Sequence, residues 1–170
     1  MPSLIVMSGL PGTGKTTISK VLARDLSAFH LRIDTIEAAL KRSMLRIHPA
    51  QDAGYLAAYG VAADNLFGET IVIADSVNPV LESRLAWQDT ARSANAQLVE
   101  VEVVCSDVQM HRQRVEARMA DIPALAVPDW KSVASHAYQP WTSPRLVIDT
   151  AHLSPAGAAE RIAAQIVRKP

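Results

Sequence analysis

The chain has 170 residues, a length that accommodates one domain with a hydrophobic core. Its 17 acidic and 17 basic residues give a formal net charge of zero, so no overall field draws it to nucleic acid or to anionic lipid. The 49% of hydrophobic residues exclude a disordered chain, and the single cysteine excludes an internal disulfide. We therefore expect one domain over residues 1–170, in the cytoplasm and without a membrane span.

The most informative stretch lies near the N-terminus, where the apolar residues 4–7 predict a buried strand and lead into Gly-Leu-Pro-Gly-Thr-Gly-Lys-Thr at 9–16. These eight residues match the phosphate-binding pattern G-x-x-x-x-G-K-[ST]. The glycines allow successive amide N–H groups to turn toward a phosphate, Lys15 adds positive charge, and the Thr16 hydroxyl is a ligand for Mg²⁺. A chance match, or a glycine turn that binds nothing, is the alternative. The predicted nucleotide contacts are Gly9, Gly12, Thr13, Gly14, Lys15, Thr16 and Thr17.

The remainder of the chain alternates apolar runs with helical patterns. We expect strands at 29–33, 70–74, 97–105 and 146–148, and helices at about 15–26, 35–41, 54–69, 80–94, 107–119, 129–138 and 155–167. Asp34 is expected to cap the second helix. This order predicts an α/β, three-layer P-loop NTPase fold, in which helices flank a five-stranded parallel sheet. Ligands of such sheets bind at the carboxyl ends of the strands, where Asp34, Asp75, Cys105 and Asp149 lie.

Several classes of phosphate-loop protein do not fit the sequence. No guanine-reading Asn/Thr-Lys-x-Asp motif is present, and Asn78 replaces the glycine that an Asp-x-x-Gly switch beginning at Asp75 would need. Ser76 follows the strand-end aspartate where motor ATPases carry a second acidic residue, and the chain is shorter than a motor core. A small kinase is therefore the favoured interpretation.

Two strand-end carboxylates are candidates for the chemistry. Asp34 can orient an acceptor hydroxyl and take its proton, or it can serve only as a helix cap. Asp75 follows the run Ile-Val-Ile-Ala and can hold Mg²⁺ directly or through water, or it can form an Asx turn toward Asn78 and Pro79.

Three arginines complete the predicted site. Arg114 and Arg118 are four residues apart and share a helix face, which suggests a short arginine-bearing lid over the phosphates. The alternative is an exposed helix in which they pair with Glu116 and Asp121. Arg84 is a candidate for binding an anionic substrate, or an ordinary surface arginine.

These motifs resemble those of the small P-loop kinases, which are often labelled AAA-type ATP-binding proteins although they are not AAA+ motors. The resemblance rests on the phosphate loop, Asp34, the stretch Val-Ile-Ala-Asp-Ser-Val-Asn-Pro at 72–79 and the spacing of Arg114 and Arg118, and it runs over nearly the whole chain. The group includes relatives of chloramphenicol phosphotransferase, gluconate kinase, adenylyl-sulfate kinase and the kinase domain of polynucleotide kinase.

The resemblance implies an ATP- and Mg²⁺-dependent phosphotransferase with Asp34 as the base and with Arg114 and Arg118 in the lid. Many members carry an arginine three positions after the acidic residue, where this chain has Glu37, so an acceptor with a phosphate or sulfate at that point is disfavoured. The expected partners are a nucleotide and a small hydroxylated acceptor. A regulatory ATPase without such an acceptor and a polynucleotide 5′-hydroxyl kinase remain as alternatives, the latter weakened by the neutral charge.

Overall fold

The computed structural model, which describes residues 1–47, 49–68, 70–123 and 125–166, is built on one five-stranded sheet. All neighbouring strands are parallel, and their order across the sheet is β2-β3-β1-β4-β5. The strands are β1 (Ser3–Ser8), β2 (Phe29–Arg32), β3 (Ile71–Asp75), β4 (Gln97–Val104) and β5 (Leu146–Asp149). The predicted α/β fold with a five-stranded parallel sheet is confirmed.

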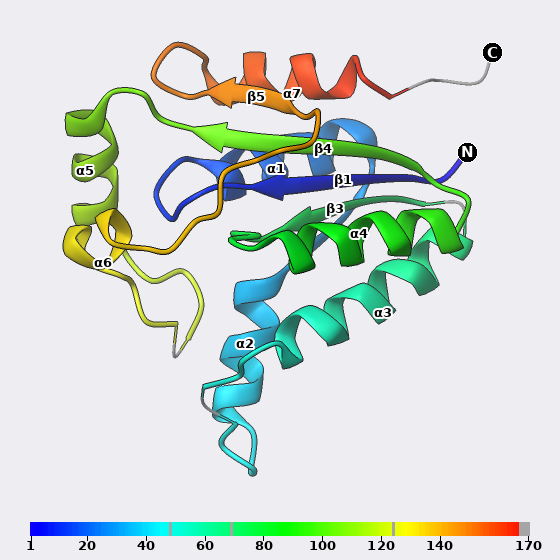
Figure 1. Cartoon of the computed structure of the whole chain (residues 1–170), viewed down its shortest axis with the longest axis horizontal. Helices are drawn as coiled ribbons and strands as arrows, with labels where there is room; N and C mark the ends of the chain where they lie inside the picture. The colour runs from blue at the N-terminus through cyan, green and yellow to red at the C-terminus, as the bar shows by residue number, and fades with distance from the viewer. Residues whose placement is uncertain (48, 69, 124, 167–170) are drawn as a thin grey trace.

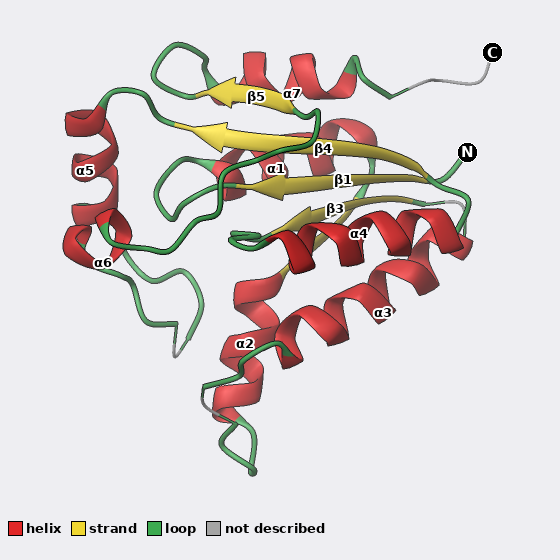
Figure 2. Ribbon diagram, in the orientation of Figure 1, coloured by secondary structure: helices red, strands yellow, loops and turns green. Residues whose placement is uncertain are grey.

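Helices cover both faces of the sheet (Figure 1). Helices α1 (Lys15–Leu26) and α7 (Pro155–Ala163) pack side by side on one face, and α3 (Ala53–Phe67) and α4 (Leu81–Ser93) cover the other. The arrows of β1, β3, β4 and β5 in Figure 2 point toward the edge where α5 (Val108–Glu116) and the short α6 (Trp130–Ala134) lie. Helix α2 (Ile33–Arg42) follows β2 directly and packs against α3.

The central strand β1 explains why the sheet has two covered faces. Alternate side chains of a strand point to opposite faces, so Leu4 and Val6 enter one apolar cluster while Ile5 and Met7 enter the other. All four are fully buried. The first cluster packs Trp87 of α4, and the second packs Ile18 of α1. A strand buried on both faces reads as a continuous apolar run, which is what the sequence has at 4–7.

The first helix matches its predicted range, whereas most other boundaries differ by a few residues. The clearest error concerns Asp34, which does not cap α2: the helix begins at Ile33, its N-cap is Arg32, and Asp34 lies in the first turn. Helix α5 ends at Glu116, so Arg118 lies in the segment after it rather than on the helix. The predicted helix ends at 69 and 167 lie outside the described residues.

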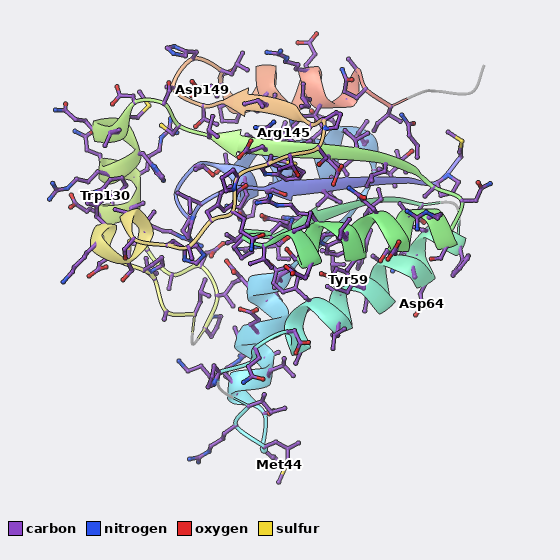
Figure 3. All side chains as sticks on the ribbon, in the orientation of Figure 1. Met44, Tyr59, Asp64, Trp130, Arg145 and Asp149 are labelled. Atoms are coloured by element: carbon purple, nitrogen blue, oxygen red, sulfur yellow. The ribbon has the colours of Figure 1, made fainter. Side chains whose placement is uncertain are left out.

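Figure 3 shows the described side chains on this arrangement of helices and strands. Among the described residues, no helix is both long enough and apolar enough to cross a bilayer. The carboxyl edge of the sheet, where β1 and β3 end beside α2 and α5, is the part of the fold that holds the predicted site residues.

Candidate active site

A cavity of about 750 Å³ opens at the carboxyl edge of the sheet. Its walls come from the phosphate loop, the start of α2, the turn after β3, the segment that follows α5 and the turn after β5. The volume falls within the range of small-molecule sites. Of the predicted residues, Gly12, Gly14, Lys15, Thr16, Thr17, Asp34, Asp75, Arg114 and Arg118 line it.

The phosphate loop is held in a conformation that requires glycine. Gly12 has φ +82°, and a Cβ there would collide with a methyl group of Val115 on α5. Around it, the imidazole Nε2 of His111 donates to the Pro11 carbonyl at 2.8 Å, and the Thr150 hydroxyl donates to the Thr13 carbonyl at 2.8 Å. Contacts from two distant parts of the chain therefore fix the loop before α1 begins.

Lys15 is buried, with 7% of its surface exposed, and its Nζ donates to two carbonyls of its own loop, those of Gly9 at 2.7 Å and Leu10 at 2.9 Å. Burial lowers the pKa of Lys15 to about 8, although the charges of Asp75 and Asp34 oppose that shift. The ammonium thus lies among loop carbonyls at the wall of the cavity, where an anionic ligand would stabilise its charge.

Asp75 ends β3 and is only 5% exposed. Its Oδ2 is 3.1 Å from His30 Nε2 and 3.8 Å from the Arg32 Nε. Burial alone would raise the pKa of Asp75, but the hydrogen bond with His30, the charge of Lys15 and the Thr16 hydroxyl lower it overall. A carboxylate held in its ionised form beside Thr16 provides oxygen ligands of the kind that Mg²⁺ prefers.

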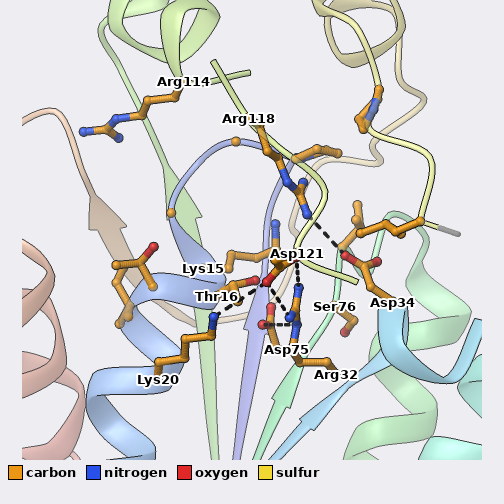
Figure 4. A pocket seen from close by; sticks show the side chains of 18 of the residues that line it. Lys15, Thr16, Lys20, Arg32, Asp34, Asp75, Ser76, Arg114, Arg118 and Asp121 are labelled. Atoms are coloured by element: carbon orange, nitrogen blue, oxygen red, sulfur yellow. Dashed lines mark hydrogen bonds and ion pairs between the residues drawn. The ribbon is translucent and has the colours of Figure 1, made fainter. Parts of the chain in front are cut away.

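Asp34 lies on the opposite side of the cavity from Arg114, with the phosphate loop between them (Figure 4). Its side chain is 39% exposed, and its Oδ2 is 3.6 Å from the Arg118 Nη2. The position at the first turn of α2, rather than at the N-cap, turns the carboxylate toward the cavity instead of toward the helix amides. The alternative that Asp34 is only a cap is therefore wrong.

The two predicted lid arginines occupy different settings. Arg114 on α5 donates to the Thr150 hydroxyl at 2.7 Å and to the Thr150 carbonyl at 3.1 Å, which ties its helix to the turn after β5. Arg118 reaches across to Asp34. Neither pairs with Glu116, which instead binds Arg112 on the exposed side of the helix.

The structure does not bring Arg84 to the cavity, and we correct that prediction. Arg84 is 2% exposed and donates to the carbonyls of Asn78, Gln139 and Pro140. Its guanidinium also stacks over the rings of Tyr138 and Trp141, at 5.1 and 4.3 Å from their centroids. Arg84 therefore holds the segment before β5 against α4.

Sequence reasoning missed an ionic network that crosses the mouth of the cavity. Arg32 binds both oxygens of Asp121 at 2.9 and 3.3 Å while it faces Asp75, and Lys20 lies 3.6 Å from Asp121 (Figure 4). These hydrogen bonds from Arg32 are the main reason that the pKa of Asp121 is lowered. The position of Arg32 at the end of β2 could have identified it as a site residue, because ligands bind where the carboxyl ends of the strands meet. No feature of the sequence indicated that Arg32 pairs with Asp121, which lies 89 residues away in the chain.

The strand order, the glycine-rich loop and the cavity at the strand ends define a protein of the kinase-like P-loop class. Residues 4–136 match the family model described as AAA domain, and the chain belongs to that family. No curated protein sequence matches the chain.

Solved structures share the fold at low sequence identity. A presumed kinase from Chloroflexus aurantiacus has 21% identity and a TM-score of 0.78, over 98% of this chain and 99% of that one. Kti12 of Chaetomium thermophilum, solved with ADP-AlF3, has 22% identity and a TM-score of 0.71, over 97% and 100%. The adenylyl-sulfate (APS) kinase CysC of Mycobacterium tuberculosis, solved with AMPPNP and APS, has 18% identity and a TM-score of 0.68, over 96% of each chain. These likenesses support the fold and leave the acceptor open.

Proposed function

We propose that this protein is a phosphotransferase that moves the γ-phosphate of ATP, with Mg²⁺, to a hydroxyl group of a small molecule. The observation that carries the proposal is that Asp34 and Lys15 line one cavity, with the phosphate loop between Asp34 and Arg114. A protein that only hydrolysed ATP would need room for no more than a water molecule beside such a carboxylate. Kti12 was solved with ADP-AlF3 and the APS kinase with AMPPNP and APS, which supports nucleotide binding by a protein of this fold.

The residues present fit a magnesium ion. Thr16 and Asp75 lie together at the start of α1 and the end of β3, and Mg²⁺ in such sites takes one or two protein oxygens beside phosphate oxygens and water. The ion would neutralise charge on the phosphates. Within the described residues no group of three or more His, Cys, Asp or Glu side chains could form an all-protein metal cage.

The transfer step assigns a task to each protein group. Asp34 orients the acceptor hydroxyl and accepts its proton as the hydroxyl oxygen bonds to the γ-phosphorus. The bond from that phosphorus to the bridging oxygen breaks, and its electron pair leaves with ADP. Lys15, Arg114 and Arg118 are the cations at the cavity wall that stabilise the negative charge spread over the transferred group.

The test is a screen for coupled ADP release over sugars, aminoglycosides, phenicols, nucleosides and 5′-hydroxyl oligonucleotides, with the mass of each acceptor measured afterwards. We expect at least one small acceptor to gain the mass of one phosphoryl group. Phosphorylation of oligonucleotides alone would identify a polynucleotide kinase instead. ADP release with no phosphorylated product from any acceptor would contradict the proposal and favour a regulatory ATPase.

A further inference from the structure

Glu37 and Asp121 are the two carboxylates lining the cavity that the proposed transfer does not use, and Glu37 is the one beside Asp34. It lies one turn after Asp34 on α2, and it lines the same end of the cavity. Residues three apart on a helix are neighbours on its surface, with Cβ atoms about 5–6 Å apart. Two carboxylates therefore face the space where the acceptor of the proposed function would lie.

The charges of this end are not balanced. Each of the other carboxylates that line the cavity has a basic partner: Asp75 has His30 and Arg32, Asp121 has Arg32 and Lys20, and Asp34 has Arg118. Glu37 forms no ion pair or hydrogen bond with any residue in the described part of the chain. The half-buried Glu37 carboxylate at the cavity wall is therefore available to a ligand that supplies a positive charge.

The neighbouring helix makes room for this carboxylate. Gly54 of α3 faces Glu37, and a Cβ at position 54 would lie 2.6 Å from the Glu37 Cγ and 3.1 Å from its Oε1. Any other residue at 54 would therefore push the side chain out of its present position. Burial against α3 and the nearby charge of Asp34 both raise the pKa of Glu37, which agrees with the absence of a positive partner.

A second polar group at this end, beside the Tyr55 hydroxyl, has no well-aligned hydrogen bond within the described residues. Ser76, in the turn after β3, is 5% exposed and lines the cavity between Asp75 and Asp34 (Figure 4). Its hydroxyl makes no hydrogen bond of good geometry among the described residues. The Tyr55 hydroxyl beside it already accepts the amide N–H of Asn78 at 3.1 Å. A buried hydroxyl left in this way is available to a polar ligand.

We propose that the acceptor is a hydroxylated amine, whose protonated amino group binds Glu37 while its reacting hydroxyl lies at Asp34. This inference rests on the proposed phosphotransferase function and specifies its substrate class. The Cβ atoms of residues three apart on a helix lie about 5–6 Å apart, so one small molecule can present an amino group to Glu37 and a hydroxyl to Asp34. Ser76 supplies a further hydrogen bond to the polar part of the same molecule.

The experiment compares amines with their N-acetylated forms, because acetylation keeps every hydroxyl and removes the positive charge. The probes are glucosamine, serinol and kanamycin, each beside its N-acetyl derivative, with ATP and Mg²⁺ and the full chain. We expect kcat/KM to favour an amine by about 10–100-fold, the size of a hydrogen-bonded charge contact. Glu37→Gln should abolish that preference, and Glu37→Asp should restore part of it.

Glu100→Gln is the matched control. Glu100 on β4 is likewise half-buried with a pKa raised by burial, but it accepts hydrogen bonds from Gln88 and does not line the cavity. This variant should keep the preference for amines. Transfer to acceptors without any preference for amines, or a preference that survives in Glu37→Gln, would overturn the inference and leave the phosphotransferase intact.

A binding measurement separates the two proposals if no acceptor is phosphorylated. Calorimetry with ADP and Mg²⁺ present would then be run with the same six probes. Amine-selective binding that Glu37→Gln removes would support the amine site while the transfer reaction fails. Equal or absent binding of amines and N-acetyl derivatives would overturn the amine site as well.

Discussion

The two ends of the cavity differ in which parts of the chain form them. At the proposed phosphate end, neighbouring residues of the loop and the start of α1 form the wall, and Lys15 is buried among loop carbonyls. At the acceptor end, separate elements contribute single side chains: Asp34 and Glu37 from α2, Ser76 from the turn after β3 and Arg118 from the segment after α5. Under the proposed function, phosphate recognition depends on a local backbone shape, whereas acceptor recognition depends on side chains that only the tertiary fold brings together.

Asp34→Asn should impair acceptor activation without affecting ATP binding, and it should give the largest loss of activity among the predicted changes. The amide keeps the size of the side chain but cannot take a proton, so kcat for transfer should fall by about 10²–10⁴ while the Kd for ATP stays unchanged. Once an acceptor is known, product formation measures kcat and calorimetry measures the Kd.

The matched control for this variant is Glu82→Gln. Glu82 carries a negative charge in the first turn of α4, as Asp34 does in α2, and it does not line the cavity. Either change should cost about 0.3–1 kcal/mol of stability through the helix dipole. Transfer at the wild-type rate in Asp34→Asn would end the general-base assignment.

The phosphate end can be tested through the pH dependence of ATP binding. The pKa of Lys15 is about 8 because of burial, and bound phosphates would favour the charged ammonium and raise it. ATP affinity should therefore be level below pH 8 and fall above it, by up to about tenfold per pH unit. Calorimetry at pH 7, 8 and 9 measures the slope.

Lys15→Ala identifies the group responsible for that slope. The variant should bind ATP about 10–100-fold more weakly at pH 7, since it loses a charged donor to the phosphates. Its affinity should then vary little between pH 7 and 9. Parallel slopes in the two proteins would assign the pH dependence to another group.

Glu37→Gln should give the smallest effect, in thermal stability. Burial raises the pKa of Glu37 above its ordinary value, so stability is lost as the pH rises from the ordinary pKa to the raised one, and no penalty exists where Glu37 is protonated in both states. The variant should therefore melt at a higher temperature than the wild type at pH 7. That difference should shrink as the pH is lowered toward 4, which a melting series would follow. A lower melting temperature at pH 7 would indicate a stabilising partner for Glu37.

The same contrast explains what could be predicted from the sequence. The structures of the apolar run at 4–7 and of the motif after it are determined by the local sequence. The central strand and helix α1 were therefore predicted correctly. The acceptor end was predicted only in part. Asp34 was assigned to the N-cap because a carboxylate before a helical pattern usually caps it, but β2 ends one residue earlier than expected.

Arg84 shows the other limit of sequence reasoning. An arginine one turn into a helix reads as exposed, and only the fold reveals that carbonyls from residues 139 and 140 surround it. In the sequence, Glu37 was singled out only because it occupies a position where many small P-loop kinases have an arginine. Its lack of a charge partner could not be predicted, because that property depends on every residue that packs around it.

The contact between Gly12 and Val115 has a mechanical consequence. Together with the bond from His111 to Pro11, it fastens α5 to the phosphate loop, and Arg114 fastens the same helix to Thr150. These contacts hold helix α5 and the phosphate loop in a fixed relative position. Helix α5 ends at Glu116, so Arg114 belongs to the part held against the loop, whereas Arg118 lies in the segment beyond it.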